Sequence, residues 1–136
     1  MSSTDLRAYE QLCSLIKKGG TNTFCDYGCG DGALLGRISS SFPELECFGI
    51  DTFSQWPINE RPQDYGRVKF VDRFSKHFDA LLNSSCFDII STVCTVHHFK
   101  HPISELRMIE GLLNDTKGQL LIVDFAFSNL FNGERV

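Results

Sequence analysis

The 136-residue sequence predicts an α/β domain with a mainly parallel sheet of about five strands and helices on both faces. Short apolar runs alternate along the chain with segments of helical periodicity. These runs are apolar at nearly every position, which is typical of strands buried on both faces. Apolar residues make up 42% of a chain whose length suits one globular domain.

The first expected element is an amphipathic helix over residues 4–18, where apolar side chains recur at helical spacing and two glycines follow a basic last turn. The apolar run at 23–27 is too short for a helix and leads into glycines, so it is expected to form the first strand. Residues 32–41 predict a helix, which ends before Pro43 because the residue preceding a proline avoids the helical conformation.

The later elements continue this alternation. Residues 52–66 contain Pro57 and Pro62, which interrupt any helix there, so we expect a loop or a single turn. The remaining strands are expected at 45–51, 67–72, 87–93 and 119–127, with helices at 73–83 and 103–114. All elements are assigned to a single domain, residues 1–136, made of the N-terminal helix, a core at 22–127 and a short tail at 128–136.

Charge and composition exclude several classes of function. The net charge is -4, from 13 basic and 17 acidic residues, which disfavours nucleic acid as a partner. No signal peptide and no apolar run near the roughly 18 residues of a membrane span are visible, so we expect a cytoplasmic protein without a membrane partner. The six cysteines are therefore expected to be mostly buried free thiols, and they lack the paired spacing of zinc ligands, so no metal is expected.

A glycine-rich turn follows the first expected strand. Residues 26–32 read Asp-Tyr-Gly-Cys-Gly-Asp-Gly and lead directly into a helix. Glycines let the backbone approach a ligand closely, and the helix N-terminus offers free N–H donors. Asp51 ends the second strand, 19 residues after Gly32, where a carboxylate can accept both hydroxyls of a ribose. The pattern favours a ribose-containing ligand; the alternative is a plain tight turn.

Residues 26–32 resemble the Asp-x-Gly-x-Gly-x-Gly motif of class I, Rossmann-like S-adenosylmethionine-dependent methyltransferases. The resemblance continues at Asp72, at 87–99 and at 112–120, and it covers about residues 22–125. The segment at 87–99 is similar to the subgroup that resembles quinone-biosynthesis methyltransferases. The resemblance implies S-adenosylmethionine as cofactor, a small-molecule acceptor and the strand order 3-2-1-4-5.

The resemblance also implies roles for individual residues. Asp26 would hold the ammonium of the cofactor's methionine moiety, directly or through water, Asp51 would bind the ribose, and Asp72 would bind the adenine amine. Further contacts would come from turn glycines, from backbone carbonyls after the fourth strand and from an aromatic side chain stacked on adenine: Gly28, Gly30, Gly32, Thr92 or Val93, and Phe53 or Trp56. For the two aromatic residues, ordinary apolar cover is the alternative interpretation.

A general base is a second prediction about chemistry. Methyl transfer from a sulfonium needs mainly alignment, and a base is required only when the acceptor nucleophile carries a proton. His97 and His98 follow the fourth strand on the ligand side, and Asp124 lies near the end of the fifth. We hypothesise that His97, or alternatively His98, is a general base oriented by Asp124. The alternative is that both histidines only shape the pocket.

Two departures from the family pattern leave other functions open. The connection at 52–66 lacks the family's usual helix, and the chain stops after the fifth of seven usual strands. The apolar strand at 119–127 would then be an edge, which we expect to be covered by 128–136, by a second copy in a homodimer or by further polypeptide. The alternatives are a non-catalytic methyltransferase-like binding or assembly module, and an RNA methyltransferase domain of a larger protein.

Overall fold

The computed structural model describes residues 2–124, which contain one five-stranded sheet. Its strand order is β3-β2-β1-β4-β5, and every neighbouring pair is parallel. Both the predicted fold class and the strand order are confirmed. The strands are β1 (Thr23–Tyr27), β2 (Glu46–Asp51), β3 (Val68–Asp72), β4 (Ile89–Val93) and β5 (Gln119–Val123).

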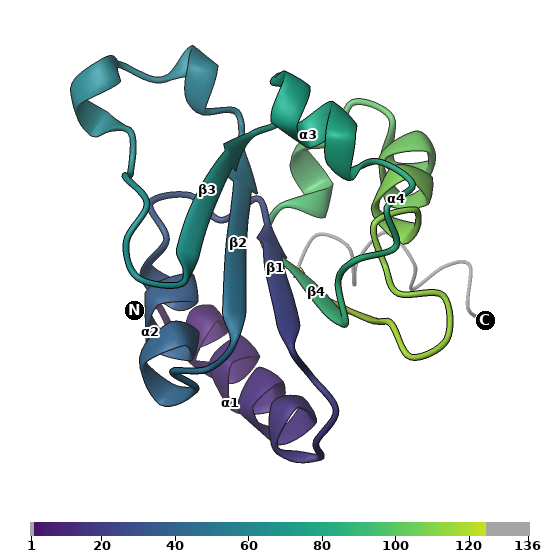
Figure 1. The fold of residues 1–136 in the computed structure, drawn as a ribbon. Coiled ribbons are helices and arrows are strands. Elements are labelled where there is room, and N and C mark those ends of the chain that lie inside the picture. The colour runs from purple at the N-terminus through teal and green to yellow at the C-terminus, as the bar shows by residue number, and fades with distance from the viewer. Residues whose placement is uncertain (1, 125–136) are drawn as a thin grey trace.

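Helices cover both faces of the sheet (Figure 1). The helices are α1 (Ser3–Lys17), α2 (Ala33–Ser41), α3 (Lys76–Leu81) and α4 (Pro102–Glu110). On one face, Leu12 of α1 belongs to a buried apolar cluster with Phe24 of β1. On the other face, Phe78 of α3 belongs to a second cluster with Cys25 of β1. Consecutive strand residues point to opposite faces, so β1 contributes to both clusters.

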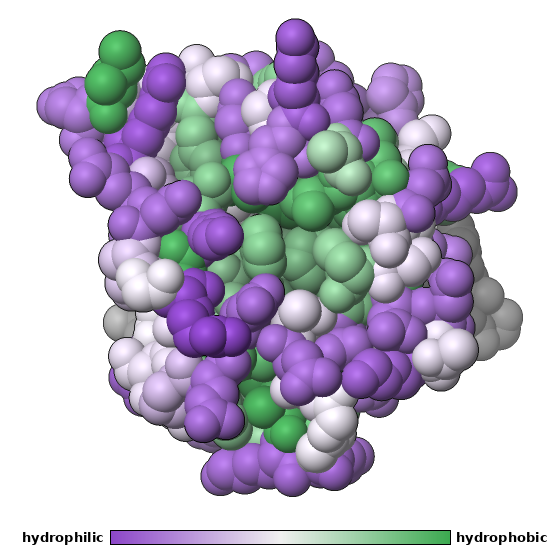
Figure 2. All heavy atoms as spheres, viewed as in Figure 1, coloured by the Kyte–Doolittle hydropathy of each residue, from purple (hydrophilic) through white to green (hydrophobic). Residues whose placement is uncertain are grey.

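The apolar surface is uneven. Figure 2, drawn from the same side as Figure 1, shows an apolar area over the strands between α2 and α3, ringed by polar residues. The most exposed large apolar side chains among the described residues are Ile58 (81%), Phe74 (61%) and Ile103 (62%). All three lie in connections, or at the start of a helix, that follow the carboxyl end of a strand. Apolar side chains therefore reach solvent at the end of the sheet where its ligands are expected.

The boundaries of two helices and the form of one connection differ from what the sequence predicts. The segment 52–66 forms two 3-10 turns, Phe53–Gln55 and Ile58–Glu60, instead of a loop or a single turn. α3 starts only at Lys76 because the Ser75 hydroxyl caps it, accepting from the Phe78 N–H at 3.1 Å. α4 ends at Glu110, with Gly111 as its cap, and the Phe87 N–H then donates to the Leu112 carbonyl at 3.0 Å. Local capping and tertiary pairing override the apolar periodicity at these ends.

β5 lies at one edge of the sheet, next to β4. The tail at 128–136 falls outside the described residues, so the expected cover of this edge stays a prediction. No helix within residues 2–124 is both long and apolar enough to cross a bilayer.

All six cysteines are free thiols, three buried and three half-buried. Burial raises the pKa of Cys47 to about 11, so this thiol stays protonated at neutral pH. In the part of the chain that the structure describes, no three histidine, cysteine or acidic residues group as metal ligands would. The cysteines of this fold thus behave mainly as small packing residues.

Candidate functional site

A cavity of about 720 Å³ opens at the carboxyl ends of the strands. Its walls come from the glycine turn after β1, the end of β2, the segments after β3 and β4, and the first turn of α4. Parallel pairing sets these strand ends side by side, and ligands of open α/β sheets bind in that position. The cavity is therefore the candidate site.

The glycine turn needs its glycines for steric reasons. Gly28 has φ +84, and a Cβ there would lie 2.4 Å from side-chain atoms of Thr95. Gly30 has φ +58, and a Cβ there would meet nothing within 4 Å. Both residues line the cavity. The turn thus presents bare backbone to the cavity, and its left-handed conformations disfavour other residue types.

Asp51 is held in a fixed orientation at the end of β2. Its Oδ2 accepts from the Gly30 N–H at 2.9 Å, and its Oδ1 accepts from the Thr52 N–H at 2.7 Å. Asp51 is half-buried and lines the cavity. The Thr52 hydroxyl also donates to Oδ1, at 3.4 Å, whereas Oδ2 accepts a single hydrogen bond within residues 2–124 and retains capacity for a ligand. A pair of neighbouring hydroxyls suits such a carboxylate.

Asp26, near the end of β1, lies in a different environment. It is only 3% exposed, and its Oδ1 accepts from the Ser91 hydroxyl at 2.9 Å. Burial raises the pKa of Asp26 to about 7, and the hydrogen bond from Ser91 partly opposes this rise. Asp26 does not line the cavity in this structure. A cation placed beside it would favour its ionised form.

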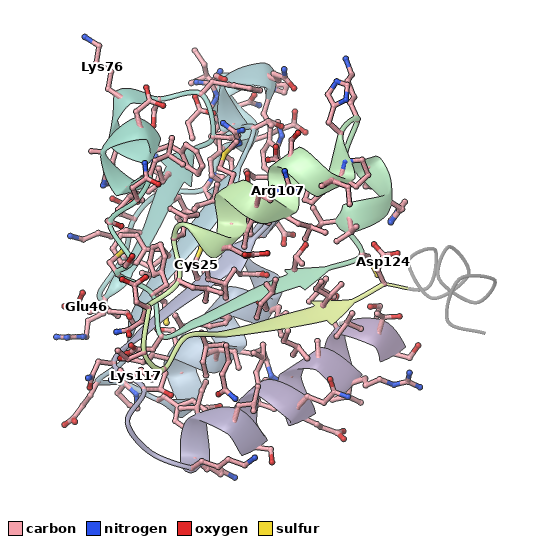
Figure 3. All side chains as sticks on the ribbon, turned by 90° about the vertical axis from the view of Figure 1, so that its right-hand side faces the viewer. Cys25, Glu46, Lys76, Arg107, Lys117 and Asp124 are labelled. Carbon is pink, nitrogen blue, oxygen red and sulfur yellow. The ribbon has the colours of Figure 1, made fainter. Side chains whose placement is uncertain are left out.

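Two histidines and Asp124 meet where β4 and β5 end. His97 Nδ1 lies 2.8 Å from Asp124 Oδ2, and the Asp124 side chain is fully buried. The ring of His98 lies 3.9 Å from that of His97, measured between centroids. His98 lines the cavity, whereas His97 does not. Figure 3 shows Asp124 at the end of β5, at the opposite end of the sheet from Glu46 and Lys117.

A polar cluster that sequence reasoning missed joins β1, the segment after β3, and α4. The Tyr27 hydroxyl donates to Glu105, and Arg73 Nε donates to Tyr27 Oη at 2.8 Å and to Glu105 Oε2 at 3.1 Å. All three residues line the cavity. Burial alone would lower the pKa of Arg73, but Glu105 and Tyr27 raise it. The sequence shows only that Arg73 lies in a locally basic stretch at 61–77 and that Glu105 lies in a first helical turn.

Comparison with known proteins identifies the family. Residues 6–133 match the model of a family described as "Methyltransferase domain". The chain belongs to this family. Among curated relatives, an uncharacterized methyltransferase of Mycobacterium bovis is 27% identical over 126 residues, which span 92% of this chain and 61% of the relative. The malonyl-[acyl-carrier protein] O-methyltransferase of Porphyromonas gingivalis is 26% identical over 130 residues, 91% of this chain and 47% of that protein.

Solved structures agree with this assignment. The plantazolicin methyltransferase BpumL, in complex with a monoazolic desmethylPZN analogue and SAH, has a TM-score of 0.70 and is 26% identical. The match covers 89% of this chain and 47% of BpumL. The methyltransferase domain described here thus spans between about half and three fifths of the length of these relatives.

The structure divides the predicted site residues of this methyltransferase domain into two groups. Those that line the cavity are Gly28, Gly30, Asp51, Val93 and His98. Those that do not are Asp26, Gly32, Phe53, Asp72, Thr92, His97 and Asp124. Within residues 2–124, the buried Thr92 hydroxyl has no hydrogen-bond partner.

Asp72 and Phe53 instead stabilise the turn after β2. Asp72 Oδ1 accepts from the Ser54 N–H at 3.3 Å and from the Ser54 hydroxyl at 3.2 Å. Phe53 is buried, with its ring edge-on to Trp56 at 4.9 Å and to Phe70 at 5.9 Å between centroids. For Phe53, these contacts correspond to the apolar cover considered as its alternative role.

Proposed function

We propose that this methyltransferase domain binds S-adenosylmethionine and transfers its methyl group to a small-molecule acceptor. The observation that carries the proposal is the fixed Asp51 carboxylate beside a bare glycine turn, both on the wall of one cavity. The solved complex of BpumL with SAH, the demethylated cofactor, supports the same ligand class. When bound, the sulfonium supplies an already activated methyl group.

The chain's own residues bind and orient that cofactor. Asp51 accepts hydrogen bonds from the two ribose hydroxyls, and Gly28 and Gly30 let the ligand lie against the backbone. Asp26 holds the ammonium, which favours a carboxylate that burial otherwise keeps partly protonated. The Val93 carbonyl already accepts from the Thr95 hydroxyl at 3.0 Å and retains a second lone pair for the methionine end.

Proton removal from the acceptor falls to an imidazole. Asp124, by accepting at His97 Nδ1, holds that ring with Nε2 as the site that takes the proton. His98 offers a second possibility, because it lines the cavity itself. The two roles are separable: His97→Ala and His98→Ala should differ in turnover, with roughly 100-fold or greater loss in the variant that lacks the base. A His97→Ala domain with full turnover would exclude His97 from this role.

The proposed function is tested by titration calorimetry of the folded chain with S-adenosylmethionine and with SAH. We expect saturable heat and a raised melting temperature with both ligands, because a ligand that binds only the folded state stabilises it. No heat and no thermal shift at saturating ligand would overturn the proposal. A second assay, transfer of a labelled methyl group to small molecules, protein and RNA, separates an enzyme from a binding module. Binding without transfer to any of these acceptors would favour the module.

A further inference from the structure

One part of the cavity wall is not used by the proposed cofactor contacts, and we call it the cationic wall. It comes from the segment after β3 and from the connection between β4 and α4: Arg73, Phe74, His98, Phe99, Lys100 and His101. Among residues 2–124, the two carboxylates that line the cavity are Asp51, proposed for the ribose, and Glu105, paired with Arg73. Two fixed positive charges and two imidazoles thus gather in a chain whose net charge is -4.

Arg73 is the most constrained member of the cationic wall. Its Nε donates to Tyr27 and Glu105, its Nη2 donates to Glu105 at 3.4 Å, and its Cζ lies 4.5 Å above the Phe78 ring. Its Nη1 has no acceptor within residues 2–124, and the side chain is 20% exposed. The guanidinium is therefore held in place and keeps unused N–H donors at the cavity wall.

The other members of the cationic wall suit an anion with an apolar body. Lys100 and His101 are exposed where they line the cavity, and Lys100 adds a positive charge without a carboxylate partner among the described residues. Phe74 and Phe99 present rings beside these charges. The half-buried charge of Arg73 attracts an anion more strongly than a fully solvated charge would.

We propose that the cationic wall binds an anionic oxygen group of the methyl acceptor, a carboxylate or a phosphate, with Arg73 as the specificity-determining residue. This inference rests on the proposed function. The planar fork of an arginine matches either group, because both present two oxygens to parallel N–H donors. Glu105 and Tyr27 position Arg73, and the two phenylalanines contact the body of the acceptor. The acceptor class is thus a small organic acid or phosphate ester.

The first experiment is a paired acceptor panel with a labelled methyl donor. Hydroxyl-, amine- and thiol-bearing carboxylic acids form one arm and phosphate esters the other, and each compound is paired with its amide or its dephosphorylated form. We expect transfer to anionic members, with an acceptor KM at least about tenfold below that of the neutral partner. The arm that responds identifies the anion. Equal KM values within pairs, or transfer to neutral members only, would overturn the inference.

Variants then test Arg73 itself. Arg73→Gln should raise the KM of the anionic acceptor at least about tenfold, with the donor KM nearly unchanged, and so abolish the preference within each pair. Arg73→Lys should restore part of it, because it keeps the charge and loses the fork. Arg107→Gln is the matched control, since Arg107 is an exposed arginine of α4 outside the cavity wall. If Arg73→Gln raised the KM of the acid and the KM of its neutral partner equally, the role of Arg73 would be merely structural.

Lys100→Gln keeps the inference testable if Arg73→Gln unfolds, because Lys100 is exposed and makes no ion pair with any residue between 2 and 124. We expect a roughly two- to fivefold rise in the KM of the anionic acceptor. An unchanged KM would argue against the cationic wall. Donor binding is measured separately by calorimetry. Normal donor binding with no transfer to any anionic member overturns this inference alone, whereas absent donor binding overturns the proposed function, and the inference with it.

Discussion

Asp26 and Asp51 end neighbouring parallel strands, yet their carboxylates lie in opposite environments. Asp51 is half-buried, accepts from two backbone N–H groups and faces the cavity. Asp26 is almost fully buried and accepts from one hydroxyl, and burial raises its pKa to about 7. Backbone N–H groups thus hold the Asp51 carboxylate in a fixed orientation, whereas the ionised form of Asp26 is destabilised unless a cation lies beside it. Under the proposed function, the cost of burying the ionised Asp26 is offset when the cofactor's ammonium binds beside it.

The largest expected effect is on stability. Asp26→Asn should stabilise the ligand-free domain by about 2–4 kcal/mol at pH 8, because the amide removes a buried charge and still accepts from Ser91. A raised carboxyl pKa means that the folded state holds the proton more tightly, so the cost of ionised Asp26 is full above pH 7 and shrinks as pH falls toward 3.8. Urea unfolding at pH 5.5 should therefore show roughly half the gain seen at pH 8.

The exposed Asp79→Asn on α3 is the control for this comparison. It removes the same charge at a solvated position, so we expect a change within about 0.5 kcal/mol at both pH values. If Asp79→Asn changed the free energy of unfolding as much as Asp26→Asn, burial of Asp26 would not explain the gain.

Asp51→Asn should weaken binding and cost about 1–2 kcal/mol of stability, because its amide nitrogen would face one of the two backbone N–H groups that now donate to the carboxylate. An amide offers one acceptor oxygen where the carboxylate offers two, so we expect S-adenosylmethionine to bind roughly 10–100-fold more weakly. Titration calorimetry measures the affinity, and a thermal melt without ligand measures stability. An Asp51→Asn domain with wild-type affinity would remove the ribose role from Asp51.

The pH dependence of affinity sharpens the same contrast. Because only ionised Asp26 attracts the cofactor's ammonium, affinity should fall roughly five- to tenfold from pH 7.5 to 6.0, as protons compete at a pKa of about 7. A nucleoside without the methionine portion, 5′-methylthioadenosine, is the matched control ligand and should bind with little change over this range. Parallel profiles for the two ligands would contradict the role of Asp26.

The smallest effect concerns Ser91. Removing its hydroxyl in Ser91→Ala deletes the hydrogen bond that favours ionised Asp26, so the pKa of Asp26 rises further. Affinity for the sulfonium donor at neutral pH should drop roughly two- to tenfold. Because the pKa of Asp26 is higher in this variant, the pH at the midpoint of the affinity profile should also be higher. A midpoint that stays in place would show that Ser91 has no influence on this carboxylate.

The sequence predicted the parts of this site that arise from local patterns. The glycine turn and Asp51 belong to one strand–helix–strand unit, so residue spacing alone locates both. The order of the elements follows from the alternation of apolar runs with segments of helical periodicity. The polar cluster at Arg73 was not predictable in this way. Its bonds join residues 78, 46 and 32 positions apart, and no periodicity or spacing rule links them.

Burial explains the other gaps. Phe53 and Asp72 both sit at strand ends, but Phe53 packs with Phe70 and Asp72 binds Ser54, so neither side chain lines the cavity. The sequence also gives no measure of how deeply Asp26 is buried, and so it could not foresee the raised pKa. The contacts of Phe53 and Asp72 depend on how the connection after β2 folds back, which its prolines leave open.

Thr95 fills the space that a side chain at position 28 would need, and its hydroxyl, which donates to the Val93 carbonyl at 3.0 Å, lies 3.4 Å from the Gly28 carbonyl. The glycine turn and the connection after β4 therefore pack tightly against each other. Neither can shift outward alone without opening a void or breaking that contact. Redesign of acceptor choice through the connection after β4 would consequently disturb cofactor affinity unless positions 28 and 95 were varied as a pair.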